Sequence, residues 1–548
     1  MAAAAVGALP GLGCRAAATP VDDGVLVVSA SEQQAAWIRN FNPLLPSTRW
    51  PSAAGIHEPL LIYNTVTATW TPWLATGYAF SADARRLTFT IREGVRWSDG
   101  RPFSADDVVA TFELLRAHPA LDLQGLWTEL ASVERAEGGP PERVHLTFRR
   151  PFVPGLARAA HTPMVPKHIW SELADPVRFT NADPVGTGPF TEVRRFTTQV
   201  YELGRNPSYW QPGRPAVDAI RMPAFPGNDQ VNLALVNGEL DWAASFVPAV
   251  DRVLSARDAE HFHHWFPLVG TMVFLYVDTH TPPFDDVRVR KALSRAIDRP
   301  RMVDIAMFGY TRPADATGLS DAFAGARVAL DGEDAAWTEY DPAAAEASLD
   351  AIAPRGADGV RVSPGGRRWS FELFVVAGWS DWIRAAQVIA RDLRAVGVDV
   401  QVRLFDQSAW FDRAQRGEFT MIVGWSLEGP TPYDFYRWLM DPRTVRPRGQ
   451  AAVGNWHRFG DPEAERLLAA MEATADPEAA RQLGVELQRT FARLAPAIPL
   501  FPNPAWGEYS TRRFEGFPSA HDPYAALSPN KGPDCLVALT RIRPRSRP

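Results

Sequence analysis

Cysteine, lysine and long apolar runs are all scarce in this chain of 548 residues. Its two cysteines, Cys14 and Cys535, are too few for a disulfide framework in a chain of this length. No run approaches the roughly 20 consecutive apolar residues that a membrane-spanning helix needs. Lysine occurs only at positions 167, 291 and 531, so nearly every basic residue is an arginine, and we draw no function from this bias.

Charge of one sign is not concentrated anywhere along the sequence. The formal net charge is −6, and no long run of like charge indicates a nucleic-acid surface, so we expect no nucleic-acid partner. The hydrophobic content of 46% and the charged content of 22% are those of an ordinary folded protein. A chain of this length exceeds a single hydrophobic core, which predicts two to four domains.

Signatures of common enzymes are also missing. The chain has no G-x-S-x-G, no H-E-x-x-H and no phosphate-binding loop. A glycosidase needs two carboxylates facing each other across a sugar, and the sequence does not fix the spacing of the candidates Asp381, Glu428 and Asp434. The segment His261-Phe-His-His264 has an i, i+2 pair that suits nickel or zinc on a strand, without cysteine or carboxylate partners at metal spacing. We therefore predict no enzyme activity, no cofactor and no metal site.

The first 19 residues, MAAAAVGALPGLGCRAAAT, are rich in alanine and glycine. Leu12-Gly-Cys14 resembles the end of a bacterial lipoprotein signal, whose cysteine is lipidated and becomes the mature N-terminus. No basic residue precedes the apolar part, as a secretion signal requires, and a start codon assigned too far downstream would explain this. A disordered tail with a chance cysteine is the alternative. We predict lipidation at Cys14.

Residues 87–109, LTFTIREGVRWSDGRPFSADDVV, predict a strand, a tight turn and the start of a helix. Leu87, Phe89 and Ile91 alternate with polar residues, which is the period-2 pattern of a half-buried strand. Ser104-x-x-Asp107 places a side-chain oxygen and a carboxylate at the start of a helix, where unpaired N–H groups and a positive dipole end favour them. The whole string closely resembles the signature of the family 5 extracellular solute-binding proteins of ABC transporters, which include dipeptide- and oligopeptide-binding proteins.

The resemblance extends over nearly the whole chain after about residue 24. In residues 284–298 the apolar residues recur at helical spacing, which predicts an amphipathic helix. Residues 388–402 predict a helix that ends at Gly397 and is followed by a strand. Further segments similar to the family are residues 183–190, 205–210, 236–242 and 341–349.

The resemblance implies an α/β protein with a two-lobed periplasmic-binding-protein-like fold (type II, cluster C) and an extra inserted domain. Repeated βαβ-type units in two halves of the sequence agree with this. The expected ranges are 1–23 for a signal, lipoprotein or disordered tail, 24–55, 183–271 and 500–548 for a discontinuous lobe one, 56–182 for the inserted domain, and 272–499 for lobe two.

A bound peptide brings an ammonium group into the cleft, and an unpaired buried charge is costly. Peptide-binding members of the family supply aspartate for it in a segment that here runs from Gly424 to Asp434. This chain has Glu428 and Thr431 at the two positions concerned. Glu428 remains able to hold an ammonium, so di- and oligopeptides stay as the alternative ligand class.

Three segments, 376–382, 454–459 and 502–516, resemble the branch of the family that binds cello- or chito-oligosaccharides. The resemblance implies that Trp379 and Trp506 sandwich a pyranose ring, whose axial C–H face packs on an aromatic plane. Its hydroxyls need hydrogen bonds, because each buried unpaired group costs about 1–3 kcal/mol. The other implied contacts are Thr431, Tyr433 and Arg458 as polar groups, Phe459 as an apolar wall, and Asn42 in the similar segment 41–46. We expect Trp382 in the core and Trp425 beneath the cleft.

The sequence therefore predicts an extracytoplasmic, monomeric solute-binding component of an ABC importer. It is expected to close its lobes by hinge motion on a β-linked oligosaccharide of the cello- or chito-oligosaccharide type, or on a di- or oligopeptide as the alternative. The expected partners are the solute and the transmembrane permease subunits. The membrane is contacted only through a lipid anchor at Cys14.

Overall fold

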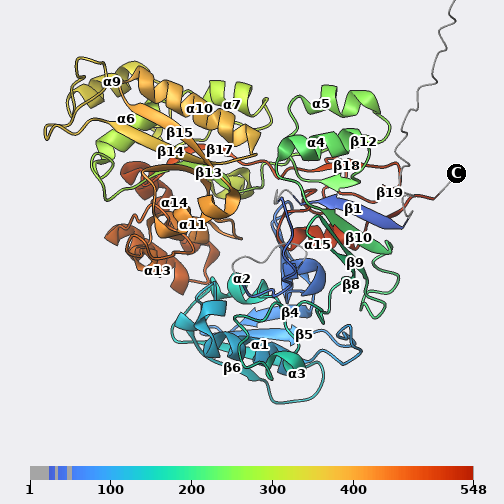
Figure 1. Cartoon of the computed structure of the whole chain (residues 1–548). Helices are drawn as coiled ribbons and strands as arrows, with labels where there is room; N and C mark the ends of the chain where they lie inside the picture. Colours follow the sequence, from blue (N-terminus) through green and yellow to red (C-terminus); the bar gives the residue numbers. More distant parts are fainter. Residues whose placement is uncertain (1–23, 31–34, 46–51, 547–548) are drawn as a thin grey trace, which may run out of the picture.

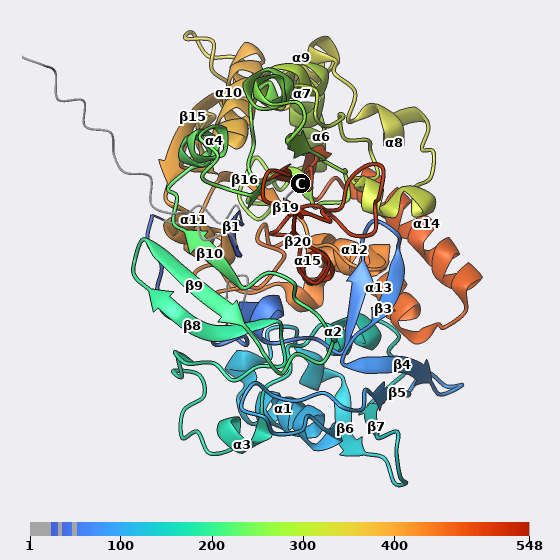
Figure 2. The ribbon, with the colours of Figure 1, turned by 90° about the vertical axis from the view of Figure 1, so that its right-hand side faces the viewer.

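The computed structural model describes residues 24–30, 35–45 and 52–546. Cys14, the predicted lipidation site, lies outside the described residues. Figure 1 shows three groups of elements: a mainly green group on the right, which also holds the blue β1 and the red α15, a mainly yellow to brown group on the upper left, and a blue to cyan group below both. Figure 2, turned by 90°, keeps the blue to cyan group below the other two.

Lobe one, the green group, is built on a sheet with strand order β12-β18-β11-β1-β10-β9-β8. The strand β1 is parallel to β10 and β11, so the carboxyl ends of these three strands share one edge. The strands are β1 (Val25–Ser29), β8 (Phe190–Phe196), β9 (Val200–Arg205), β10 (Ala219–Pro223), β11 (Trp242–Ala243), β12 (Phe262–His264) and β18 (Glu508–Ser510).

Alternation along β1 buries both faces of this sheet. Val27 belongs to a core with α4 (Asn228–Val236) and α5 (Val250–Val253), while Leu26 and Val28 join a core with α15 (Asp534–Leu539). A short ladder of β19 (Phe514–Glu515) with β20 (Arg543–Pro544) ends the described chain, and η1 (Ser52–Ile56) and η4 (Ser255–Arg257) are short helical turns. The last helix of the chain thus returns to lobe one.

Lobe two carries a sheet of order β15-β14-β16-β13-β17, with β14 parallel to β15 and β16, and β13 antiparallel to β16 and β17. The carboxyl ends of β14, β15, β16 and β17 therefore lie at the same edge as the start of β13. The strands are β13 (Met272–Val277), β14 (Ser370–Val376), β15 (Asp399–Phe405), β16 (Met421–Trp425) and β17 (Ile498–Pro502).

Helices cover both faces of this sheet, with α6, α7, α9 and α10 above it and α11, α13 and α14 below it in Figure 1. Because both faces are covered, the strands are apolar throughout, as in β13 with all six residues buried. The helices are α6 (Val287–Ala296), α7 (Arg299–Ala306), α8 (Gly332–Ala336), α9 (Pro342–Asp350), α10 (Ser380–Ala395), α11 (Gln407–Arg416), α12 (Pro432–Met440), α13 (Pro462–Ala473) and α14 (Pro477–Leu494), with turns η5 (Asp321–Ala326) and η6 (Pro442–Thr444).

The inserted domain is an antiparallel sheet of order β4-β5-β7-β6 that packs on α1. A hairpin of β2 and β3 leads into it. Its elements are β2 (Leu61–Asn64), β3 (Thr69–Pro72), β4 (Ala75–Phe80), β5 (Arg86–Ile91), α1 (Ala105–Ala117), η2 (Pro119–Leu121), η3 (Leu126–Thr128), β6 (Leu130–Arg135), β7 (Arg143–Phe148), α2 (Gly155–Ala160) and α3 (Lys167–Trp170).

Two crossing segments, 265–271 and 503–507, join lobe one to lobe two. They run side by side, since Asn503 N–H donates to the Thr271 carbonyl at 2.7 Å and Ala505 N–H to the Pro267 carbonyl at 2.9 Å. Gly270 is required there, because a Cβ at this position would lie 2.2 Å from the Asn503 carbonyl oxygen. We propose the domain ranges expected from the sequence with one change: β17 keeps pairing with β13 to Pro502, so lobe two runs to residue 502.

Local elements predicted from periodicity are confirmed. In β5, Leu87, Phe89 and Ile91 are buried, and Ser104 N–H donates to Asp107 Oδ2 at 2.9 Å at the start of α1. The predicted amphipathic helix is α6, and Gly397, at φ +85°, separates α10 from β15. The helix α10 begins at Ser380, eight residues before the expected start at 388.

Candidate ligand-binding site

A cavity of about 300 Å³ lies where the two lobes meet the crossing segments. Its residues follow the carboxyl ends of strands in both sheets. Trp379, Gln407 and Glu428 come after β14, β15 and β16, while Asn228 and Phe246 come after β10 and β11. Because parallel strands end at a common edge, this is where an α/β sheet binds ligands.

The wall contributed by lobe two is a cluster of tryptophans. The ring centroids of Trp379 and Trp382 are 4.9 Å apart at 89°, and Trp425 lies 6.2 Å from each of them. Behind Trp425 lie Trp410 at 4.9 Å and Phe411 at 5.9 Å. Trp382 is buried as expected and still lines the cavity, and Trp425, expected beneath the cleft, lines it too.

Trp506, on a crossing segment, belongs to a separate aromatic cluster that also includes residues of both lobes. Its ring lies 5.0 Å from Phe266, 5.5 Å from Phe246 and 6.0 Å from Tyr310. Both Trp379 and Trp506 line the cavity, each held by its own cluster. The structure thus places this predicted pair in one cavity, with Trp379 in the tryptophan cluster of lobe two and Trp506 in the cluster around Phe266.

Two amide oxygens of the cavity lining have no hydrogen-bond donor within the described structure. They are Gln407 Oε1, at the start of α11, and Asn503 Oδ1, on a crossing segment. A buried acceptor without a donor costs about 1–3 kcal/mol, so a ligand that donates hydrogen bonds to them removes this cost. Both oxygens are buried, so a ligand can take this role only after the two amide side chains turn toward the cavity.

Asp381 is the buried carboxylate of this cavity, at the first turn of α10. Burial raises the pKa of Asp381 to about 6, against the hydrogen bonds of the helix start and of Asn228, which lower it. Asn228 Nδ2 donates to Asp381 Oδ1 across the lobes, at 3.4 Å. The site thus contains a carboxyl group that titrates close to neutral pH.

Glu428 forms an ion pair with Lys531, which lies on the segment before α15. The Lys531 ammonium also donates to the Val269 carbonyl at 2.8 Å. Burial lowers the pKa of Lys531 to about 8, so the amine is still mostly charged at neutral pH. The predicted ammonium anchor Glu428 therefore already has a cationic partner from lobe one.

The structure places three other predicted contacts within lobe two and away from this cavity lining. Tyr433 is buried and donates its hydroxyl to Glu472 Oε1 at 2.5 Å. Arg458 is buried and donates to the carbonyls of Gln415 at 2.6 Å and Gln450 at 2.8 Å. The ring of Phe459 lies under the Arg290 guanidinium at 5.5 Å. All three side chains therefore contact other residues of lobe two.

Asn42 and Thr431 also lie outside this lining. Asn42 is buried and donates Nδ2 to the carbonyls of Phe179 at 2.8 Å and Pro176 at 3.1 Å, which fixes its loop to the residues after the inserted domain's helices. Thr431 is exposed and is the residue before α12. Of the predicted contacts, the cavity thus contains Trp379, Trp506 and Glu428.

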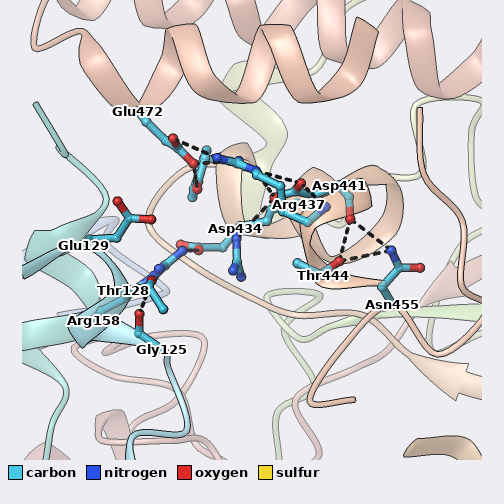
Figure 3. A network of polar contacts seen from close by, with 12 residues as sticks. Gly125, Thr128, Glu129, Arg158, Asp434, Arg437, Asp441, Thr444, Asn455 and Glu472 are labelled. Carbon is cyan, nitrogen blue, oxygen red and sulfur yellow. Dashed lines mark hydrogen bonds and ion pairs between the residues drawn. The ribbon is translucent and has the colours of Figure 1, made fainter. Parts of the chain in front are cut away.

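The inserted domain is held to lobe two by two arginines. Arg150 pairs with the buried Glu472 of α13, and Arg158 of α2 pairs with Asp434 of α12 at 3.7 Å. Figure 3 shows Arg158 and Asp434 pointing toward each other from ribbons of different domains. In addition, Val153 N–H donates to the Glu472 carbonyl at 2.9 Å. All three domains therefore contact one another around the cleft.

Sequence reasoning missed Gln407, Asn503, Asn228 and Lys531. A usable signal exists for two of them: Gln407 and Asn503 each lie within two residues of the end of a strand whose carboxyl end faces the cleft. Lys531 is one of the few lysines in the sequence. Its pairing with Glu428, 103 residues away, has no local signal.

Neither a metal cluster nor a transmembrane helix is present in the described ranges 24–30, 35–45 and 52–546. No group of three or more His, Cys, Asp and Glu side chains there could hold a metal ion. No helix there is both long and apolar enough to cross a membrane. In the segment 261–264, His261 bonds to Asp258 at 2.9 Å, and the rings of His263 and His264 lie against Tyr509 and Phe266.

Two α/β lobes joined by two crossing segments, with an aromatic cavity between them, define a solute-binding protein. The model of the bacterial extracellular solute-binding proteins, family 5, matches residues 69–445, and the chain belongs to this family. It is thus a solute-binding component of an ABC importer, which binds a small solute and delivers it to a permease. Proteins of this family are extracellular transport binding proteins and not enzymes.

Relatives of this chain differ in what they are named for. The nickel-binding periplasmic protein of Escherichia coli is 25% identical over 441 residues, covering 76% of this chain and 79% of that protein. The glutathione-binding protein of Salmonella typhimurium is 26% identical over 438 residues, covering 78% and 79%. The names of these two relatives therefore point to different solutes.

Solved structures of binding proteins share the fold of this chain. The periplasmic oligopeptide-binding protein of Thermotoga maritima with bound mannohexaose superposes with a TM-score of 0.85, at 24% identity, over 96% of this chain and 100% of that chain. The oligopeptide-binding protein AppA of Bacillus subtilis with a nonapeptide has a TM-score of 0.79, at 19% identity, over 95% and 99%. The predicted fold class is confirmed.

Proposed function

We propose that the solute is a β-linked oligosaccharide of the cello- or chito-oligosaccharide type. The observation that carries this proposal is the cavity itself, which combines Trp379 and Trp506 on separate walls with the unpaired acceptors Gln407 Oε1 and Asn503 Oδ1. A pyranose packs its C–H faces on aromatic planes, and its hydroxyls donate hydrogen bonds at the rim.

The charge balance of the cavity supports a neutral ligand. Lys531 already neutralises Glu428, so this pair offers no free carboxylate to a peptide's ammonium group. Lys531 is buried and Glu428 is half-buried, so a ligand that draws Glu428 away leaves the Lys531 ammonium buried without its counter-charge, which is unfavourable. An uncharged polyol leaves the pair intact. The Thermotoga maritima protein, which has the same fold, was solved with a hexasaccharide bound.

A second candidate is a di- or oligopeptide, with Asp381 in place of Glu428 as the carboxylate that holds the ammonium. Asp381 is buried in the cavity lining, and its raised pKa reflects the energetic cost of the isolated charge. An ammonium beside it would remove that cost. The glutathione-binding relative supports this class of ligand.

We also propose that the protein acts as a monomer and is anchored by a lipid on Cys14. The first proposal is tested by light scattering of the purified protein with and without ligand. The second is tested by expressing Cys14→Ala and the wild type and fractionating the cells. Release of the variant, but not of the wild type, from the membrane fraction is the expected result. Equal release contradicts the anchor.

The ligand class is tested by calorimetric titration of the full chain with cellobiose, cellotetraose, chitobiose and trialanine. Binding of a saccharide and no heat with trialanine is the expected result. Binding of trialanine alone, lost in Asp381→Asn, contradicts the saccharide proposal and supports the peptide. The Asp412→Asn variant, at an exposed site on α11, is the control for a general effect of removing a carboxylate.

A further inference from the structure

A cavity of about 450 Å³ lies within lobe two, at the edge of its sheet that is opposite to the aromatic cavity. Its lining comes from the turn after β13, the residues before β16, and two loops near residues 445–448 and 456–458. Because β13 and β16 are antiparallel, the end of β13 and the start of β16 share this edge, whereas Thr271 and Trp425 line the aromatic cavity at the other edge. The six residues of β13 separate the two cavities by roughly 20 Å.

Three arginines line this cavity together with one carboxylate. They are Arg446, Arg448 and Arg458, and the carboxylate is Asp278. Arg448 Nη1 lies 3.6 Å from Asp278 Oδ2. Among the described residues, the side chains of Arg446 and Arg458 have only backbone carbonyls as hydrogen-bond partners and form no ion pair. This space, which we call the arginine cavity, therefore has an excess of positive charge.

The charge of Arg458 is buried and held in place by the backbone. Its Nη2 donates to the carbonyls of Gln415 at 2.6 Å and Gln450 at 2.8 Å, and its buried Nε has no acceptor in the part of the chain that the structure describes. Burial lowers the pKa of Arg458, Asp278 raises it in part, and the like charge of Arg446 lowers it further. A buried cation that is compensated only in part is unfavourable, and an anion beside it reduces this cost.

A glycine leaves the space that the Arg458 guanidinium occupies. Gly417 has φ +65°, and a Cβ there would lie 3.2 Å from both Cζ and Nε of Arg458. Asp278, in contrast, is turned to its own chain, since Oδ2 accepts from the Thr281 hydroxyl at 2.7 Å and Oδ1 from the His280 N–H at 3.2 Å. The carboxylate thus holds the turn after β13 and balances only part of the charge of the three guanidinium groups.

The chemistry of the lining suits a compact oxyanion. Apolar side chains form much of the remaining lining, namely Phe419, Val445, Pro447 and Trp456. In such surroundings a hydrogen bond to an ion is stronger than in water. A guanidinium presents a planar fork of donors that matches two oxygens of a phosphate group. Three arginines and one aspartate leave a charge of +2, not counting His280, and a phosphate monoester carries about −1.5 to −2 at neutral pH.

We propose that the arginine cavity binds a phosphate group, at a second site of lobe two that is separate from the solute site. A free phosphate ion and the headgroup of an anionic lipid share this chemistry, and the test distinguishes them. The buried Arg458 supplies a fixed positive charge, and the exposed Arg446 and Arg448 supply donors that turn toward the anion. The proposal does not depend on which solute the aromatic cavity takes.

The first test is a calorimetric titration of the full chain with inorganic phosphate. It is made in about 0.1 M NaCl, where exposed charges more than about 10 Å apart are largely screened. We expect one phosphate per chain, and at least tenfold weaker binding in the double variant Arg446→Gln/Arg448→Gln, whose exposed positions leave the core intact. The control is Arg466→Gln/Arg489→Gln, which removes the same charge from exposed arginines of α13 and α14 and should bind like the wild type.

The second test is sedimentation of the same proteins with vesicles of phosphatidylcholine, with and without phosphatidylglycerol. Free phosphate bound without vesicles assigns the site to the ion, and vesicles with phosphatidylglycerol bound without free phosphate assign it to a lipid headgroup. Either result supports the site when Arg446→Gln/Arg448→Gln weakens it and the control does not. No binding of either probe, or binding that both double variants retain or lose equally, overturns the proposal. The saccharide proposal stays separate, because it is tested with cellobiose.

Discussion

The backbone N–H of Asn228 in lobe one donates to the carbonyl oxygen of Gly378 in lobe two, with 3.1 Å between nitrogen and oxygen. Beside this bond, a Cβ on Gly378 would lie only 2.7 Å from the Pro226 carbonyl oxygen. Gly378 also has φ +87°, a region that L-residues with a side chain rarely adopt. The two lobes thus touch through bare backbone next to the cavity-lining residues Asn228 and Trp379, and a side chain at residue 378 has no room between them.

The Gly378→Ala variant is expected to close poorly on its ligand. The added methyl must push the lobes apart, because its neighbour is backbone and cannot swing away. We expect at least a tenfold loss of affinity, and a ligand-bound radius of gyration by small-angle scattering that stays at the unbound value. Gly449→Ala is the matched control, since Gly449 has the same φ of +87° with nothing within 4 Å of a Cβ. Equal losses in both variants contradict this.

Glu472 is expected to be essential for the attachment of the inserted domain. Burial alone would raise its pKa, but hydrogen bonds from Arg443, Tyr433 and Arg150 outweigh this and lower it. Glu472→Gln leaves the arginines without their counter-charge, and we expect a loss of about 3 kcal/mol in the free energy of unfolding by denaturant titration.

A second glutamate on the same helix provides the control for Glu472. Glu463 pairs with Arg466 at 2.7 Å on the exposed side of α13. Glu463→Gln should leave the unfolding midpoint nearly unchanged, because exposed ion pairs contribute little. A similar shift of the unfolding midpoint in both variants would mean that the domain contact at Glu472 contributes no more to stability than an exposed ion pair does.

The buried Asp381 should make stability depend on pH in a defined window. Its pKa is raised from 3.8 to about 6 in the folded protein, so the folded state binds the proton more tightly than the unfolded state. Its contribution to stability is therefore complete below pH 4 and is lost as the pH rises through 6. The difference between the two pKa values corresponds to a contribution of roughly 3 kcal/mol at most to the free energy of unfolding.

Comparison with Asp381→Asn isolates this contribution from other carboxylates. The difference in unfolding free energy, Asp381→Asn minus wild type, is expected to rise between pH 4 and pH 7 and then level off. Any effect of the substitution on the start of α10 adds a constant amount to this difference in unfolding free energy, which does not change with pH. A difference that does not change over this range shows that Asp381 does not titrate there.

Local patterns in the sequence predicted the fold well because they reflect local physics. The period-2 alternation at Leu87, Phe89 and Ile91 and the glycine at 397 each fix a strand or a helix end without help from distant residues. Trp379 and Trp506 were found by resemblance, since two residues 127 positions apart share one cavity only through the sheet order of the fold. Segment similarity thus pointed to two residues that line one cavity, and their contact with a ligand stays a prediction.

The rest of the site depends on side-chain directions that the sequence does not encode locally. Tyr433 was expected at the ligand, but it lies near the start of α12 and points toward Glu472 on α13. Arg458, at φ +60°, points back to the carbonyls of its own lobe. Both residues were expected at the ligand because their positions in the sequence match the family's. The resemblance did not include the neighbouring side chains, which decide where Tyr433 and Arg458 point. The partner of Glu428 comes from the last segment of the chain.

The central claim, that the aromatic cavity between the lobes is the site for a β-linked saccharide, is tested most directly by titrating cellobiose into three tryptophan variants. Trp379→Ala and Trp506→Ala remove one wall each, and Trp127→Ala, in the inserted domain, is the control. We expect each wall variant to lose about 2 kcal/mol of binding free energy, roughly thirtyfold, while Trp127→Ala binds like the wild type. Unchanged cellobiose affinity in both wall variants, each shown to be folded by its circular dichroism spectrum, would contradict the claim.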